Sequence, residues 1–155
     1  MAADPKGRAL MIGAVEKQKF VYILNRDSQN KLTISSPLEA HKAHTITFAM
    51  CGVDVGIENP QFACIECDYG EADNQYSAVV TGEHQKMLIF YEMDLGLNHV
   101  VRKFSTPVEK TAHMLIPAPA EPYGPGGILV VSENSIAYKK IDHDERECSI
   151  PIRNE

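Results

Sequence analysis

The chain has 155 residues, of which 44% are hydrophobic and 23% charged, and its formal net charge is −6. This composition excludes an intrinsically disordered chain, which would combine few apolar residues with a high net charge. The acidic balance also disfavours a general nucleic-acid binder, because polyanions are bound mainly by clustered lysine and arginine. We therefore expect a packed core and at most one ordinary domain.

Neither a secretory signal nor a membrane span is expected. The first ten residues, MAADPKGRAL, have no apolar segment behind their charges. The longest near-apolar run, residues 9–15, is far shorter than the roughly 20 residues that a helix needs to cross a bilayer. The four cysteines form no dense disulfide framework, so reduced thiols inside the cell are the expected state.

Short runs rich in β-branched and aromatic residues follow one another along the chain, with turn residues between them. The eleven runs are residues 9–15, 20–24, 31–35, 45–51, 62–67, 87–92, 99–104, 113–116, 128–132, 135–141 and 147–152. No window of 11 or more residues keeps helical apolar spacing, and nine prolines and ten glycines interrupt the chain. An all-β fold is therefore predicted.

Two of these runs, residues 20–24 and 128–131, are apolar at successive positions. Such runs are typical of interior strands that are covered on both faces. Two further segments, Ser36-Pro37-Leu38-Glu39 and Thr106-Pro107-Val108-Glu109, have the form of a helix capping box. Few residues separate each of them from the next apolar run, so at most one helical turn is predicted there.

The same segments belong to an internal repeat. SSPLE at position 35 returns as STPVE at position 105, an offset of 70, and a shorter echo, SIPI, begins at 149, another 44 residues on. Residues 68–85 are polar and rich in turn residues, which indicates a flexible loop insertion. Without that insertion the first offset approaches the second. A period of about 40–45 residues with four strands is typical of β-propeller blades.

The repeat divides the chain into a three-strand partial blade (residues 9–35) and two four-strand blades (45–104 and 113–152). The predicted fold is thus a partial, WD-repeat-like β-propeller of just under three blades of antiparallel sheet. Propellers close with typically 4–8 blades, so residues 1–155 are expected to be an incomplete propeller segment of a longer protein. Further blades are then expected to cover the apolar faces of the two outermost blades.

Two pairs of potential metal ligands occur in the sequence. Cys64 and Cys67 form C-x-x-C, and His41 and His44 form H-x-x-H, so a zinc site is one hypothesis. Residues three apart in a strand point to opposite faces, which favours buried structural cysteines instead.

A calcium loop is the second hypothesis, over residues 142–147 (Asp142, His143, Asp144, Glu145 and Glu147). The glycine that an EF-hand loop needs at its sixth position is replaced by Glu147, so a hairpin turn is favoured. The glycines in residues 124–127 make no phosphate-binding motif and indicate another turn. No catalytic, cofactor-binding or metal-binding residue is assigned, and no small-molecule substrate is expected.

The basic residues occur in isolated pairs. Arg102 and Lys103 form one pair, and Lys139 and Lys140 form another. On a chain of net charge −6 they offer little affinity for a polyanion, so RNA contact is expected to be indirect at most.

Four long phrases carry a specific resemblance: residues 7–27, 32–46, 52–66 and 90–105. In these phrases the chain resembles the splicing factor 3b subunit 3 family of spliceosome-associated multi-propeller proteins. That family is related to the cleavage and polyadenylation specificity factor A subunit and to the large damaged-DNA-binding protein. The resemblance covers nearly the whole chain and weakens in residues 68–86 and 118–127.

The resemblance implies an N-terminal β-propeller region and a nuclear, non-catalytic scaffold. Its implied partners are other splicing factor 3b subunits and proteins of the U2 small nuclear ribonucleoprotein, which recognises the branch site in pre-mRNA splicing. The alternative is a propeller of a cleavage and polyadenylation factor or of a damaged-DNA-binding ubiquitin-ligase adaptor. An enzyme, either metal-dependent or hydrolytic, is the third hypothesis and requires the cysteine and histidine pairs, or an unrecognised triad, to converge.

Overall fold

The computed structural model describes residues 1–13, 18–40, 45–68 and 85–151, and within these ranges the chain forms strands and turns but no helix. The strands are β1 (Ala2–Ala3), β2 (Ala9–Gly13), β3 (Lys19–Arg26), β4 (Leu32–Ile34), β5 (Leu38–Glu39), β6 (Thr45–Val53), β7 (Gln61–Asp68), β8 (Lys86–Asp94), β9 (His99–Pro107), β10 (Met114–Pro117), β11 (Ile128–Val131), β12 (Ser135–Lys139) and β13 (Arg146–Ser149). No described segment is a helix long and apolar enough to cross a membrane.

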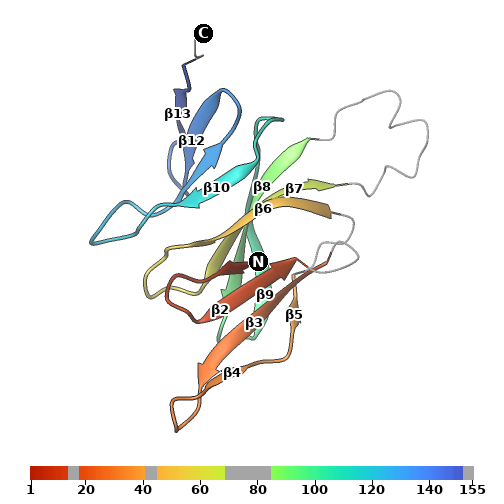
Figure 1. The fold of residues 1–155 in the computed structure, drawn as a ribbon, viewed down its shortest axis with the longest axis vertical. Helices are drawn as coiled ribbons and strands as arrows, with labels where there is room; N and C mark the ends of the chain where they lie inside the picture. Colours follow the sequence, from red (N-terminus) through yellow and green to blue (C-terminus); the bar gives the residue numbers. More distant parts are fainter. Residues whose placement is uncertain (14–17, 41–44, 69–84, 152–155) are drawn as a thin grey trace, which may run out of the picture.

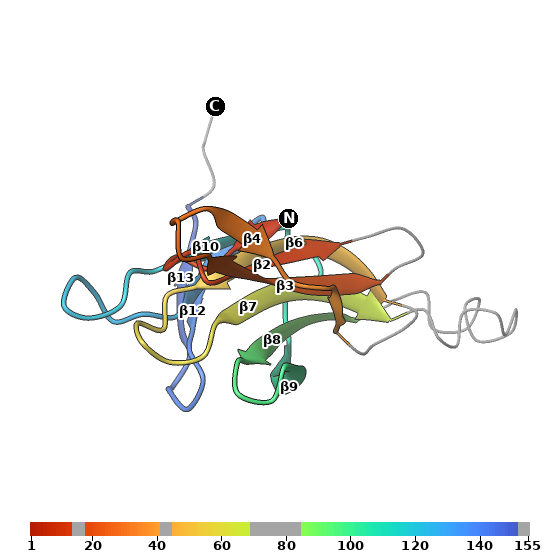
Figure 2. The same cartoon turned by 90° about the horizontal axis from the view of Figure 1, so that it is seen from below.

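The strands form three antiparallel sheets in chain order (Figures 1 and 2). The first has the order β1-β2-β3-β4, with β5 also paired to β3; the second is β6-β7-β8-β9 and the third is β10-β11-β12-β13. The second sheet lies between the other two, and the three sheets do not close into a ring. This is the predicted all-β, partial-propeller architecture, and that prediction is confirmed.

All eleven predicted runs contain a strand, but two strands were not predicted. β1 and β5 have two residues each, which is too short for an alternating pattern to show in the sequence. β1 lies against β6, and Gly52 permits this approach because a Cβ there would lie 2.0 Å from the carbonyl oxygen of Ala3. The first sheet therefore extends beyond the three strands expected in residues 9–35.

The two segments with capping-box form contain no helix, which agrees with the predicted limit of one turn, and they lie partly in strands. Leu38 and Glu39 pair with β3 as strand β5, and Thr106 and Pro107 continue strand β9. A hydrogen-bonded turn does follow, because the amide of Ala112 donates to the carbonyl of Glu109 at 2.9 Å. Strand pairing overrides the local capping signal because each pairing connects the segment to a packed sheet.

Burial distinguishes the second sheet from its neighbours. β7 and β8 contain consecutive buried residues because both of their faces are covered. β3 and β11 are interior strands of their sheets, as predicted, but in both the burial largely alternates. The expectation that those two strands are covered on both faces is therefore wrong within this chain.

One hydrophobic core lies between the first and second sheets. The first sheet contributes Ala9, Met11 and Val21, and the second contributes Phe62 and Cys64, all 0% exposed; the other buried members are Ala2, Ala40, Ile89, Tyr91, Met93 and Val100. The contributors of β7 are its even-numbered residues, as strand alternation requires.

A second core lies between the second and third sheets. The odd-numbered residues Ala63 and Ile65 of β7 point into it, and β11 contributes Ile128 and Val130; the other buried members are Cys51, Val53, Leu88, Phe90, Val108, Ala112 and Leu115. The two cores therefore share the middle sheet as a common layer.

The first interface also buries charge. Lys19 on β3 places its ammonium group 2.9 Å from a carboxylate oxygen of Glu66 on β7, and both side chains are 1% exposed. The hydroxyl of Tyr91 donates to the same carboxylate at 3.0 Å, and the ammonium also donates to Thr45 and Thr47. Each buried polar group thus has a partner, as burial requires.

The outer faces of the flanking sheets are apolar and half-exposed. On the third sheet, Ile116 pairs with Leu129 and Leu129 with Tyr138, while Met114 pairs with Val131. On the first sheet the outward-facing side chains are Leu10, Ile12, Phe20, Tyr22 and Leu24. These side chains have no covering layer in the described residues, as expected for sheets at the two ends of an open stack.

Residues 69–84, which make up most of the predicted insertion at 68–85, lie outside the described residues. Asp68 ends β7 and Gln85 immediately precedes β8, so the segment connects two neighbouring strands of the middle sheet.

Candidate protein interface

Three loops meet at one end of the molecule. Residues 4–8 connect β1 to β2, residues 54–60 connect β6 to β7, and residues 118–127 connect β10 to β11. In Figure 1 they are the red, yellow and cyan loops that project to the left. Because each loop joins the first two strands of its own sheet, the repeated topology brings all three to the same end.

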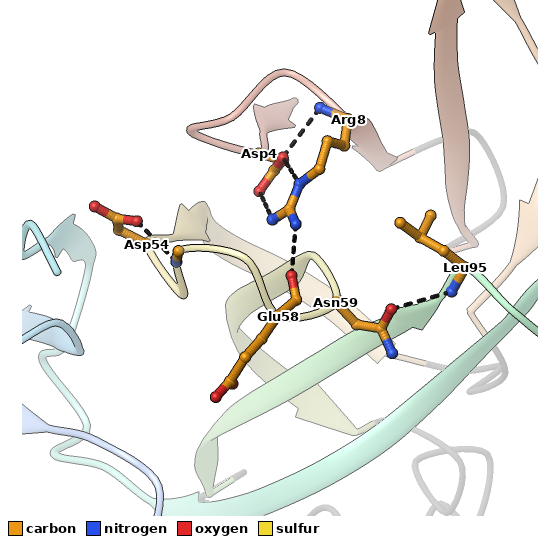
Figure 3. Close-up of polar contacts among 7 residues, drawn as sticks. Asp4, Arg8, Asp54, Glu58, Asn59 and Leu95 are labelled. Atoms are coloured by element: carbon orange, nitrogen blue, oxygen red, sulfur yellow. Dashed lines mark hydrogen bonds and ion pairs between the residues drawn. The ribbon is translucent and has the colours of Figure 1, made fainter. Parts of the chain in front are cut away.

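Arg8 connects the first loop to the second. Its guanidinium donates to the carboxylate of Asp4 through Nε at 2.8 Å and through Nη2 at 3.0 Å, and it donates to the carbonyl of Glu58 through Nη1 at 2.6 Å (Figure 3). The pair with Asp4 raises the pKa of Arg8. Because the Asp4 side chain is 1% exposed, this two-point contact holds the guanidinium in one orientation.

Asp54 connects the second loop to the third. Its carboxylate accepts hydrogen bonds from the amide of Ala120 at 2.9 Å and from the amide of Gly56 at 3.2 Å. These two donors, Ala120 first, lower the pKa of Asp54 because they favour the charged form.

Asn59 extends this network to the loop between β8 and β9, since its side-chain oxygen accepts from the amide of Leu95 at 3.4 Å (Figure 3). The end of the molecule is therefore a set of loops joined by hydrogen bonds.

Large apolar side chains project from these loops into solvent. Ile57 is 99% exposed, Tyr123 is 87% exposed and Leu97 is 78% exposed. Each lies on a different loop, on a backbone held by hydrogen bonds. Exposed apolar and aromatic side chains on a rigid support are typical of protein–protein contact surfaces.

The structure separates the two cysteines of the C-x-x-C pattern. Cys64 points into the first core, whereas Cys67 shares the opposite face of β7 with Ala63 and Ile65. Burial raises the pKa of both thiols. His41 and His44 lie outside the described residues. Among the residues that the structure describes, no three histidine, cysteine or acidic side chains gather to hold a metal ion.

The predicted turn between β12 and β13 is present at residues 140–145, with Asp142 at a positive φ of 61°, but Glu147 belongs to strand β13. Residues 124–127 likewise lie in a loop, with positive φ at Gly126 and Gly127.

All four paired basic residues make internal contacts. Lys103 pairs with Glu92, Lys139 pairs with Glu145, and Lys140 donates to the carbonyl of Pro125. Arg102 donates to Ser105. No pair presents two unengaged charges to a phosphate backbone.

Sequence reasoning did not identify the loop end. Arg8, Asp54 and Asn59 match no short motif, because their partners are mostly backbone groups in other loops. The available signal was the blade repeat, which places the first loop of every blade at one end, but it does not indicate which side chains connect the loops.

Comparison with known proteins gives a consistent result. A family model described as the RSE1/DDB1/CPSF1 first beta-propeller matches residues 1–155. "Splicing factor 3B subunit 3" of Drosophila melanogaster is 58% identical over 98% of this chain and 12% of its own length. "Spliceosome-associated protein 130 A" of Arabidopsis thaliana is 56% identical over 100% of the chain and 13% of its own length. "Pre-mRNA-splicing factor rse1" of Emericella nidulans is 50% identical over 99% and 13%.

The chain therefore spans 12–13% of the length of these relatives. The matched region is continuous and includes all three sheets and the loop end. Three observations agree. The chain forms three successive antiparallel sheets, the family model matches residues 1–155, and the relatives named here are 50–58% identical. This chain belongs to the RSE1/DDB1/CPSF1 first β-propeller family.

Proposed function

We propose that this chain is a non-catalytic scaffold segment that acts in pre-mRNA splicing. In this proposal it supports assembly of the U2 small nuclear ribonucleoprotein and recognition of the branch site, in the nucleus. Its partners are other splicing factor 3b subunits and U2 ribonucleoprotein proteins, and RNA contact is indirect.

The observation that carries the proposal is the 58% identity to a protein named "Splicing factor 3B subunit 3" over 98% of the chain. The relatives from Arabidopsis thaliana and Emericella nidulans also carry splicing or spliceosome names. Identity of this size extends over loops as well as strands, so it includes surface residues that a shared fold alone does not require.

The arrangement of the sheets supports a scaffold role. We propose that residues 9–35, 45–104 and 113–152 belong to successive blades of one incomplete N-terminal propeller segment, residues 1–155, and that residues 68–85 are a loop inserted in the second blade. The apolar outer faces of the first and third sheets then receive further blades. The hydrogen-bonded loop end presents exposed apolar side chains to partner proteins.

Co-purification tests the proposal. The protein is tagged in its own cells at its natural length and isolated from nuclear extract. We expect splicing factor 3b subunits and U2 small nuclear RNA in the eluate, and intron retention after depletion. Recovery of a cullin ligase or a polyadenylation complex in place of U2 components would replace the splicing role by the related adaptor or 3′-end processing role.

A further inference from the structure

A cleft of about 760 Å³ opens between the second and third sheets, at the loop end. One side is formed by the loop at 54–60, and the other by the loop at 118–127 and the turn at 140–143. The size lies within the range of ordinary binding pockets. Every lining residue belongs to the described part of the chain, and Glu58 is the one whose backbone carbonyl also accepts from Arg8 of the first loop.

The floor of the cleft is apolar. It is formed by Val53 and Phe90, which are 3% and 1% exposed and belong to the second core, and by the half-buried Val55 and Ile141. Ile57 stands at the rim and is 99% exposed. The second core thus continues to the surface here, and an apolar side chain placed in the cleft would extend it.

The two sides of the cleft are held in place before any ligand binds. Asp54 joins them through the amide of Ala120. Tyr138 donates its hydroxyl to the carbonyl of Gly126 at 3.0 Å, and Lys140 donates to the carbonyl of Pro125 at 2.8 Å. A rigid cleft loses little conformational entropy on binding, which favours affinity.

The rim is acidic. The lining residues include five carboxylates (Asp54, Glu58, Glu92, Glu121 and Asp142) but two lysines, Lys103 and Lys140. Lys103 lies 3.5 Å from Glu92, and Lys140 is engaged by a backbone carbonyl. Within the described ranges, no ion pair is formed by the carboxylates of Glu58, Glu121 and Asp142, which are exposed.

This charge pattern selects the class of occupant. A polyanion such as RNA would meet like charge on the rim, and an acidic peptide would meet the same repulsion. A segment with lysine or arginine beside a large apolar residue complements both parts of the cleft. Its apolar side chain would contact Val53 and Phe90, and its cationic groups would face Glu58 and Glu121.

We propose that this cleft binds a basic segment of a partner protein, with one large apolar side chain inserted between the loops at 54–60 and 118–127. The inference rests on the scaffold role proposed above and names the chemistry of one partner. It assigns the apolar contact to Ile57, Val53 and Phe90, and the charge preference to Glu58, Glu121 and Asp142.

The test begins with a photo-crosslinking amino acid placed at position 57 of the protein expressed at its natural length in its own cells. A matched probe is placed at Leu32, which is 52% exposed but lies on β4 of the first sheet and does not line the cleft. After irradiation, the attached segment is sequenced by mass spectrometry. We expect a protein segment with lysine or arginine beside a large apolar residue at position 57, and not at position 32.

That segment is then synthesised, and its Kd is measured by fluorescence anisotropy against the wild-type protein and two variants. The double substitution Glu58→Lys with Glu121→Lys should weaken binding at least about tenfold because it places like charges together. Leu32→Asp should leave the Kd unchanged, because Leu32 does not line the cleft.

Three results would overturn the inference: no cross-linked protein segment, attachment to RNA or to an acidic segment, or a Kd that the double substitution does not change. U2 components that still co-purify in any of these cases would leave the splicing proposal standing and reject the cleft alone. Loss of U2 components from the wild-type protein would instead reject the splicing proposal.

Discussion

Lys19 and Glu66 form an ion pair across the interface between the first and second sheets, with 2.9 Å between the ammonium nitrogen and the carboxylate oxygen. Each residue belongs to a different sheet, and both are closed to solvent. A buried ion pair contributes little net stability, but removal of either partner leaves an uncompensated buried charge and is strongly destabilising. The pair therefore fixes which residues of β3 and β7 face each other.

Removal of one charge of this pair should lower the free energy of unfolding far more than removal of both charges. Lys19→Met leaves the Glu66 carboxylate buried without a cation, and we expect a loss of about 3–5 kcal/mol in the free energy of unfolding. Adding Glu66→Gln should recover most of that loss, because the amide oxygen still accepts from Tyr91. Urea denaturation of the purified variants measures both values. Equal destabilisation by the single and double changes would show that the ion pair is not what couples the two positions.

Thiol labelling should distinguish one cysteine from the other three. Burial raises the pKa of Cys51 to about 12 and also raises the pKa of Cys64 and Cys67, whereas Cys148 is exposed on β13. We expect iodoacetamide at neutral pH to modify Cys148 in the native protein, and all four cysteines in denaturant. Peptide mass spectrometry locates the label. Rapid native modification of Cys64 would mean that the first core opens readily.

Acid should loosen the contact between the second and third loops. The pKa of Asp54 is lowered from its ordinary value of 3.8, first by the amide of Ala120 and then by that of Gly56. The stabilisation is therefore present above the ordinary pKa and is lost as pH falls through the lower, folded-state value. NMR titration of the Ala120 amide should report a midpoint below 3.8 in the wild type, and Asp54→Asn should abolish that step. A midpoint at or above the ordinary value would contradict the assignment.

The uncovered face of the third sheet should promote self-association of the 155-residue chain. Ile116 is 43% exposed in the row that contains Leu129 and Tyr138, so Ile116→Lys places a charge within that face. Burial of such a side chain contributes about 1.5–3 kcal/mol, and we expect the association constant to fall by about tenfold or more. Sedimentation velocity measures it.

The matched control is Val101→Lys on β9, where the side chain is 39% exposed and lies on another sheet. That change should leave association unaltered. A monomeric wild-type chain would show that the outer faces do not drive contact.

Strand positions could be predicted from sequence because β-branched runs and turn residues alternate clearly along the chain. The two missed strands, β1 and β5, have no periodicity of their own and exist because a longer strand offers them a free edge. The burial of Lys19 could not be predicted from sequence either. A lysine at the start of an apolar run is ordinarily an exposed strand end, and Lys19 is buried because it pairs with Glu66, almost fifty positions away.

The candidate interface was less predictable than the fold. Loop hydrogen bonds such as that from Arg8 to the carbonyl of Glu58 involve backbone acceptors, which carry no side-chain signature. The opposite orientations of Cys64 and Cys67, by contrast, followed from strand alternation alone. Strand alternation therefore separates the two thiols from sequence alone, whereas the contacts between loops are seen only in the structure.

Because the middle sheet completes both cores, the order of synthesis has a consequence. The strands up to β5 are synthesised before Phe62, Cys64 and Tyr91, yet those residues share the core with Met11 and Val21. The core-facing side of the N-terminal sheet therefore stays uncovered until β8 has been synthesised. A pause or a chaperone contact before that point would act on a segment that has no finished interior of its own.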